Sequence, residues 1–213
     1  MSDDLNYGYK GADVPQSFGN NKGVFDPNDI NNLIADNKWT SFGQLELIET
    51  KNITSSTSAI DFTDIKENIY NVHFVTASNF TASASGNYVQ SRLSNNGGSS
   101  FISSSTYQFA HQYGSTTGSF GESKSTNRTW FQYHTERGTG NAGSYAYFYN
   151  LGDSTKYSFS TVQVIGIGAQ DYMFFGSSVL PTVETHNAIR FMPSSTGTID
   201  NIDISLYGIK EYS

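Results

Sequence analysis

The sequence contains no cysteine, and this absence excludes several classes of protein at once. Without thiols the chain forms no disulfide, holds no cysteine-based zinc site and has no thiol nucleophile. Charged residues are also scarce, at 15% of the 213 residues, whereas an average soluble domain has about 25%. The net charge is −7, so the chain would repel the phosphates of a nucleic acid, and we expect no nucleic-acid partner.

Long hydrophobic runs are missing as well. The longest apolar stretches, residues 164–169 and 172–175, are far shorter than the roughly 20 residues that a membrane-spanning helix needs. The chain begins Met1-Ser2-Asp3-Asp4, which has neither the basic start nor the apolar core of a secretory signal. The sequence therefore predicts a soluble protein that is made in the cytoplasm and does not insert into a membrane.

Aromatic residues are plentiful, at 15% of the chain, and a disordered chain would lack them. From residue 39 onward, apolar and polar residues alternate in short runs that are separated by turn signals. These runs are residues 45–47, 60–62, 70–74, 89–93, 106–113, 128–135, 144–149, 157–167, 172–175, 188–192 and 199–207. Because no helical period lies between them, we predict an all-β fold, a jelly-roll-like antiparallel β-sandwich over residues 39–213.

Residues 1–38 differ from the rest and predict a mostly irregular N-terminal arm. One short helix is expected within it, because Asp26 can cap a helix and Pro27 suits its first position. A helix this short is unstable alone in water, so we interpret the arm as a segment that becomes ordered on a partner. The apolar side chains expected to anchor it there are Phe18, Phe25, Ile30 and Leu33.

No motif in the sequence predicts an active site. The histidines are His73, His111, His134 and His186. None of them pairs with another at metal-ligand spacing, and the nucleophile motif Gly-x-Ser-x-Gly does not occur. The tightest acidic cluster, around Asp200 and Asp203, is small. We therefore expect a protein that is not an enzyme, with no cofactor and no bound metal.

Aromatic residues crowd two neighbouring strand candidates. They are Trp130, Tyr133, Tyr145, Tyr147 and Tyr149. Strand alternation places the last three on one face. Two interpretations stay open: the rings pack in the core or in an oligomer interface, or they form a stacking platform for glycans. For an oligomer, a closed ring such as a trimer is the simplest arrangement.

Several turn and strand segments resemble a known family. They are residues 94–101 with Tyr107, residues 187–191, Ser195-Thr196-Gly197-Thr198-Ile199 and residues 204–210. Over about residues 40–210 they are similar to the C-terminal β-sandwich domains of tail-fibre-like virion structural proteins from marine and cyanobacterial phages. The resemblance implies an all-β fold and a virion location, after synthesis in the host bacterium's cytoplasm. It brings no catalytic residues with it.

These observations together lead to a prediction of function. We expect a structural protein of a bacteriophage virion, displayed on the particle surface and attached to other virion proteins by its N-terminal arm. A tail-fibre-like module that contacts the host, at a surface glycan for example, is the first expectation. The chain lacks a long stalk, so a head decoration or adaptor protein is the alternative. A carbohydrate-binding lectin and a glycan hydrolase are the rival classes.

Overall fold

The computed structural model describes residues 27–35, 45–84, 87–133, 143–166 and 172–210. The chain divides into two compact units, Met1–Gly43 and Gln44–Ser213. The predicted boundary between residues 38 and 39 falls in the segment 36–44, outside the described residues.

The first unit contains the predicted short helix, α1, which extends over Pro27–Ala35. Pro27 occupies its first turn, where the missing backbone N–H costs nothing. Leu33 is buried and Ile30 is half-buried, whereas Ile34 is exposed. The other two predicted anchors, Phe18 and Phe25, lie outside the described residues.

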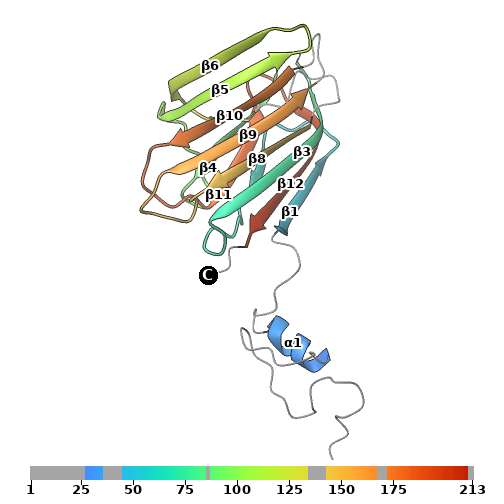
Figure 1. Ribbon diagram of the computed structural model, residues 1–213, viewed down its shortest axis with the longest axis vertical. Helices are drawn as coiled ribbons and strands as arrows, with labels where there is room; N and C mark the ends of the chain where they lie inside the picture. Colours follow the sequence, from blue (N-terminus) through green and yellow to red (C-terminus); the bar gives the residue numbers. More distant parts are fainter. Residues whose placement is uncertain (1–26, 36–44, 85–86, 134–142, 167–171, 211–213) are drawn as a thin grey trace, which may run out of the picture. The chain divides into compact units, whose positions relative to one another are not determined.

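The second unit is an antiparallel β-sandwich, as predicted (Figure 1). The described residues form twelve strands: β1 (Leu45–Ile53), β2 (Ile60–Phe62), β3 (Val72–Ala82), β4 (Val89–Ser94), β5 (Tyr107–Ser115), β6 (Phe120–Arg128), β7 (Phe131–Gln132), β8 (Gly143–Tyr149), β9 (Ser158–Gly166), β10 (Tyr172–Leu180), β11 (Ala188–Pro193) and β12 (Ile199–Ile209). The large sheet has eight strands in the order β1-β12-β3-β8-β9-β10-β5-β6, and the small sheet has the order β2-β11-β4-β7.

The core lies between the two sheets and is built by strand alternation. In β8 the side chains of Ser144, Ala146 and Phe148 are buried, and in β11 Ile189 and Phe191 are buried. Rings from the two sheets meet edge-on: the centroids of Phe148 and Phe191 are 6.3 Å apart, at 82°. Each large apolar side chain in this core contributes roughly 1.5–3 kcal/mol to the stability of the fold through its removal from water.

One strand prediction was wrong in its position. The segment 128–135 was expected to be a single strand, but β6 ends at Arg128 and β7 covers only Phe131 and Gln132. The sequence did not predict β6, because its residues are polar and show no alternation. As an edge strand paired only with β5, β6 is exposed along most of its length and has no apolar face to bury.

Candidate functional site

The outer face of the large sheet, which points away from the small sheet, is the candidate site. Strand alternation places Tyr145, Tyr147 and Tyr149 on this face. The antiparallel register then aligns them with outer side chains of the neighbouring strands, because directly paired residues point the same way. The three tyrosines therefore belong to a surface that extends across the whole sheet.

The register defines three rows of side chains across the outer face. Row one is Leu45, Ile209, Val72, Tyr149, Phe159, Val179 and Gln108. Row two is Leu47, Tyr207, Phe74, Tyr147, Thr161, Ser177 and Ala110. Row three is Thr50, Ser205, Thr76, Tyr145, Gln163, Phe175 and Gln112. None of these side chains carries a charge. The rows reach charged residues only at the edge strand β6, at Lys124 and Glu122.

The rings on β3, β8 and β12 form one aromatic cluster on this face. Phe74 lies at its centre, with its ring centroid 4.8 Å from that of Tyr147, 6.0 Å from that of Tyr145 and 6.1 Å from that of Tyr207. Tyr149 continues the cluster, stacked at 6.3 Å on Tyr147. The rings contact one another across three strands and therefore form one continuous aromatic surface on this face.

Large apolar side chains on this face are open to solvent. Leu47 is 60% exposed and Phe175 is 50% exposed, and Ile165 and Met173 extend the apolar surface into a fourth row. Seven strands about 4.8 Å apart and four rows along them cover about 600–800 Å² of sheet surface. Polar side chains such as Thr161 and Ser177 take up part of this area, and Asp203 lies in the fourth row. The apolar side chains are exposed within one continuous face, and contiguous apolar patches of a few hundred Å² often mark interaction sites.

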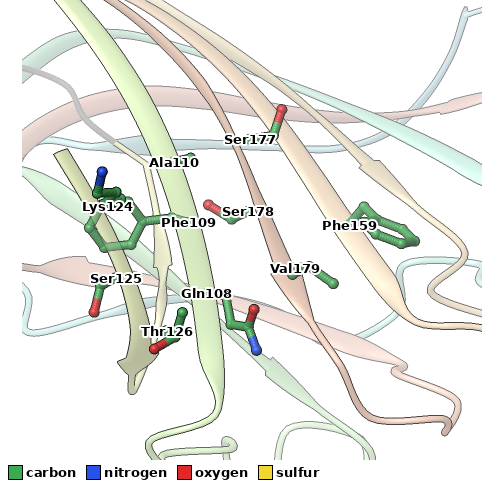
Figure 2. Close-up of a pocket in the computed structure, with 10 residues that line it drawn as sticks. All are labelled: Gln108, Phe109, Ala110, Lys124, Ser125, Thr126, Phe159, Ser177, Ser178 and Val179. Carbon is green, nitrogen blue, oxygen red and sulfur yellow. The ribbon is translucent and has the colours of Figure 1, made fainter. Parts of the chain in front are cut away.

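A hollow of about 680 Å³ opens over β5, β6, β9 and β10 (Figure 2). Ala110 and Ser177 face each other across β5 and β10, and they are small side chains. Phe159 and Gln108 from row one and Lys124 from β6 also line the hollow. It exists because row two carries small residues on these strands, while the same row on β12, β3 and β8 carries aromatic rings.

The outer face of the small sheet has a different character. Arg190 lies between the buried Ile189 and Phe191, and its guanidinium donates two 2.7 Å hydrogen bonds to the carboxylate of Asp61. These bonds raise the pKa of Arg190 above its usual value. The same guanidinium lies 4.1 Å from the ring centre of Phe101, a cation–π contact. The charge of Arg190 is therefore paired within the chain, and Arg92, directly opposite on β4, donates hydrogen bonds to the carbonyl oxygen and the hydroxyl of Thr129.

Two of the predicted aromatic residues do not lie on the outer face of the large sheet. Tyr133 is only 1% exposed, and it accepts a 3.0 Å hydrogen bond from Ser144 inside the sandwich. Trp130 lies between β6 and β7, half-buried, with the guanidinium of Arg128 4.8 Å from its ring centre. Both were grouped with the tyrosines because of their position in the sequence. The break between β6 and β7 changes the alternation on which that grouping depended.

Three residues form a chain of hydrogen bonds that has the composition of a hydrolase triad. The hydroxyl of Ser158 lies 2.8 Å from Nδ1 of His186, whose Nε2 lies 3.3 Å from the carboxylate of Glu184. However, Ser158 and His186 have no exposed surface, so the hydroxyl cannot reach a substrate. Burial lowers the pKa of His186, and its neutral ring is satisfied by accepting from Ser158 and donating to Glu184. We interpret these hydrogen bonds as a structural link between β9, which begins at Ser158, and the segment that precedes β11.

The other described histidines are also buried in the core. Nε2 of His73 donates a 2.7 Å hydrogen bond to the carbonyl oxygen of Ile65, and burial lowers the pKa of His73 to about 4. His111 lies between the rings of Phe109 and Phe174, and burial lowers its pKa to about 3. The described residues contain no group of three or more His, Asp or Glu side chains placed to hold a metal ion.

Comparison with known proteins adds no relative to this picture. The sequence matches no model of a protein family and no curated protein. Within the described ranges, no helix has the length and hydrophobicity that a membrane span requires.

Proposed function

We propose that this chain is a structural protein of a bacteriophage virion and not an enzyme, displayed on the particle surface and assembled there through the outer face of its large sheet. One observation carries the proposal: the face is uncharged across three rows on seven strands and keeps large apolar side chains in contact with water. The similarity of residues 94–101 and 204–210 to virion proteins supports the particle as the place of assembly.

The chemistry of the outer face fits contact with protein. Interface cores are depleted in charged residues and enriched in Tyr and Phe. The aromatic cluster around Phe74 and Tyr147 has this composition, and the charged Lys124 and Glu122 come only at the rim. A surface of about 600–800 Å² per partner is close to the ~800 Å² per partner of a stable protein interface.

The N-terminal unit supplies the attachment to the particle in this proposal. Helix α1 has nine residues, and an isolated helix of that length is unstable in water. Its apolar residues Ile30, Leu33 and Ile34 follow helical spacing and form one stripe. Leu33 is already buried, whereas Ile34 is 55% exposed. Docking of the exposed part of the stripe, at Ile34, on another virion protein supplies further contacts that keep the helix folded. Head decoration and adaptor proteins need such an attachment as much as tail-fibre modules do.

The hollow supports a second candidate function, binding of a host glycan. The ring of Phe159 is 41% exposed at one side of the hollow, which Gln108, Lys124, Thr126 and Ser177 also line with polar groups. An apolar surface with a few convergent polar groups is typical of a small-ligand site. A lectin, or a host-contacting fibre module, would stack a sugar ring on Phe159. Calorimetric titration with host surface polysaccharide tests this, with Phe159→Ala expected to abolish the binding heat and Phe120→Ala expected to keep it.

Purified particles provide the test of the virion role. Density-gradient-purified virions of the phage that encodes the chain should yield its peptides in mass spectrometry, at a constant ratio to the major capsid protein. Antibodies against the sandwich should label the particle surface in electron micrographs. A chain that is abundant in infected cells but missing from purified particles would reject the proposal.

A further inference from the structure

The outer face of the large sheet has two halves that differ in shape. The boundary lies between β8 and β9, with four strands on each side. In row two, the β1-β12-β3-β8 half carries Leu47, Tyr207, Phe74 and Tyr147, all large. The other half carries Thr161, Ser177, Ala110 and Lys124 in the same row, three small side chains and one flexible one. Row two is therefore raised on one half and hollow on the other.

Row three has the opposite arrangement. Its β1-β12-β3 part carries Thr50, Ser205 and Thr76, which are small. The strands β6, β5 and β10 lie at the same distances from the boundary as β1, β12 and β3. On these three strands row three carries Glu122, Gln112 and Phe175, which are large. Between rows two and three, the raised and hollow regions thus exchange halves, as a self-complementary surface requires, whereas row one carries large side chains on both halves, with Tyr149 and Phe159 at the boundary.

We propose that a second copy of this chain covers the outer face, related to the first by a two-fold axis that lies between β8 and β9 and is parallel to the strands. This rotation places β8 over β9 of the second copy, β3 over β10, β12 over β5 and β1 over β6. Phe74 then lies over Ser177 of the second copy and Tyr207 over Ala110, and Phe175 of the second copy lies over Thr76. In these parts of rows two and three, large side chains of one copy lie over small ones of the other. In row one, Tyr149 lies over Phe159 of the second copy, so two aromatic rings meet beside the axis.

Area and sheet geometry agree with this arrangement. Two faces of about 600–800 Å² bury ~1,200–1,600 Å² in total, which is the range of specific protein interfaces. Sheets that pack face to face keep their strands within about 30° of each other, and a two-fold axis parallel to the strands satisfies that condition. The charged residues Lys124 and Glu122 fall at the rim of the interface, where Lys124 can lay its apolar stem along Leu47 of the second copy.

The inference rests on the proposed function only in treating the outer face as an assembly surface. It names the partner as a second copy, in place of another virion protein, a glycan in the hollow or the N-terminal arm. The hollow cannot hold a glycan and a second copy at once, because Tyr207 and Phe74 of that copy fill it.

A charge-pair experiment on the full chain tests the arrangement. Phe74→Lys and Ser177→Glu each bury an unpaired charge in the interface, because the neighbours of both positions in the sheet are uncharged. Each should therefore raise the dimer dissociation constant about 100-fold or more in sedimentation velocity. The double variant brings the new ammonium of one copy against the new carboxylate of the other and should restore dimerisation to within about tenfold. Within one copy the two positions are three strands apart, about 14 Å, so the pair cannot form there. Ile69→Lys, at an exposed site off this face, is the matched control and should leave dimerisation unchanged.

A distance measurement keeps the test valid even if a charge variant folds poorly. Because the chain has no cysteine, a spin label on Ser123→Cys in β6 is the single label of each copy. The proposed axis places the two labels about 35 Å apart or more, whereas an axis across the strands would place β6 on β6 at roughly 10–15 Å. A trimer, a monomer at all concentrations, a short label distance, or single variants that dimerise normally would each overturn the inference. If the chain is present in particles as a monomer, the dimer is rejected and the virion role is kept. If the chain forms the two-fold dimer but is missing from particles, the dimer is kept and the virion role is rejected.

Discussion

The outer faces of the two sheets are both formed by strand alternation, but one carries charged side chains and the other carries uncharged, largely apolar ones. On the small sheet, Arg190 and Asp61 satisfy each other through two hydrogen bonds, and Phe101 lies against the guanidinium. On the large sheet, Phe74 and its neighbouring tyrosines leave an uncharged, apolar surface in contact with water. The comparison shows that on the small sheet Arg190 is satisfied within the chain, whereas the large sheet leaves apolar side chains in contact with water, which is why we propose a partner for that face.

The largest expected effect comes from a tyrosine that belongs to neither face. Tyr133→Ala removes a ring that is 1% exposed in the core and should lower the free energy of unfolding by about 3–5 kcal/mol in urea titrations. Tyr145→Ser changes a ring that is 40% exposed on the large sheet, so in dilute protein it should cost less than about 1 kcal/mol. Equal losses for the two variants would mean that Tyr145 is also a core residue and that the large sheet's face is not a free surface.

Acid should weaken the core between the two faces. The folded state lowers the pKa of His73 to about 4 and that of His111 to about 3, below the ~6.5 of an unfolded histidine. Below pH 6.5 the unfolded chain therefore takes up protons that the folded chain does not, so stability is complete above pH 6.5 and falls as the pH falls towards 4. Each histidine should cost about 2 kcal/mol between pH 7 and pH 5.

Urea titrations at a series of pH values measure this acid effect, with His73→Gln as the control. That variant should be less stable at pH 7 but should lose less of its remaining stability on acidification. An identical slope in the parent and the variant would show that His73 does not contribute to the acid effect.

Breaking the ion pair of the small sheet should have a moderate effect. Asp61→Ala leaves the half-buried guanidinium of Arg190 without its two hydrogen bonds, and should lower the free energy of unfolding by about 1–2 kcal/mol. Asp64→Ala removes an exposed ion pair with Lys66 and should change the free energy of unfolding by less than about 0.5 kcal/mol. Dimerisation should be unaffected by either substitution, and a loss of dimer in Asp61→Ala would place the interface on the small sheet instead.

Strand alternation made the fold predictable from the sequence. The candidate site was predictable only in part, because it depends on the register between strands that are far apart in the chain. Runs such as residues 144–149 and 199–207 showed their buried faces directly, so the sandwich was predictable from local pattern. The sequence grouped Tyr145, Tyr147 and Tyr149 because they share one strand. It missed Phe74, because which strands become neighbours depends on contacts between residues far apart in the chain.

β6 shows a second reason for missing structure. Its residues are polar on both sides, and only pairing with β5 makes them a strand. A periodicity argument finds elements that bury one face, so an edge strand that buries neither leaves no signal of that kind. The hollow over β10 and β5 was missed for the related reason that Ala110 and Ser177 meet only through the register of these strands.

The smallest expected effect is that of metal removal. The carboxylate of Asp200 accepts hydrogen bonds of 2.7 Å from the hydroxyls of Ser56 and Thr198, and Asp203 accepts one from the amide of Asn79. Hydrogen-bond donors of the chain thus occupy one oxygen of each carboxylate, and the hydroxyls of Ser56 and Thr198 lower the pKa of Asp200. Treatment with a chelator should therefore leave the melting temperature within about one degree, because a ligand stabilises only the state that binds it. A fall of several degrees, restored by added calcium, would show that a cation joins Asp200 and Asp203 at the end of the large sheet.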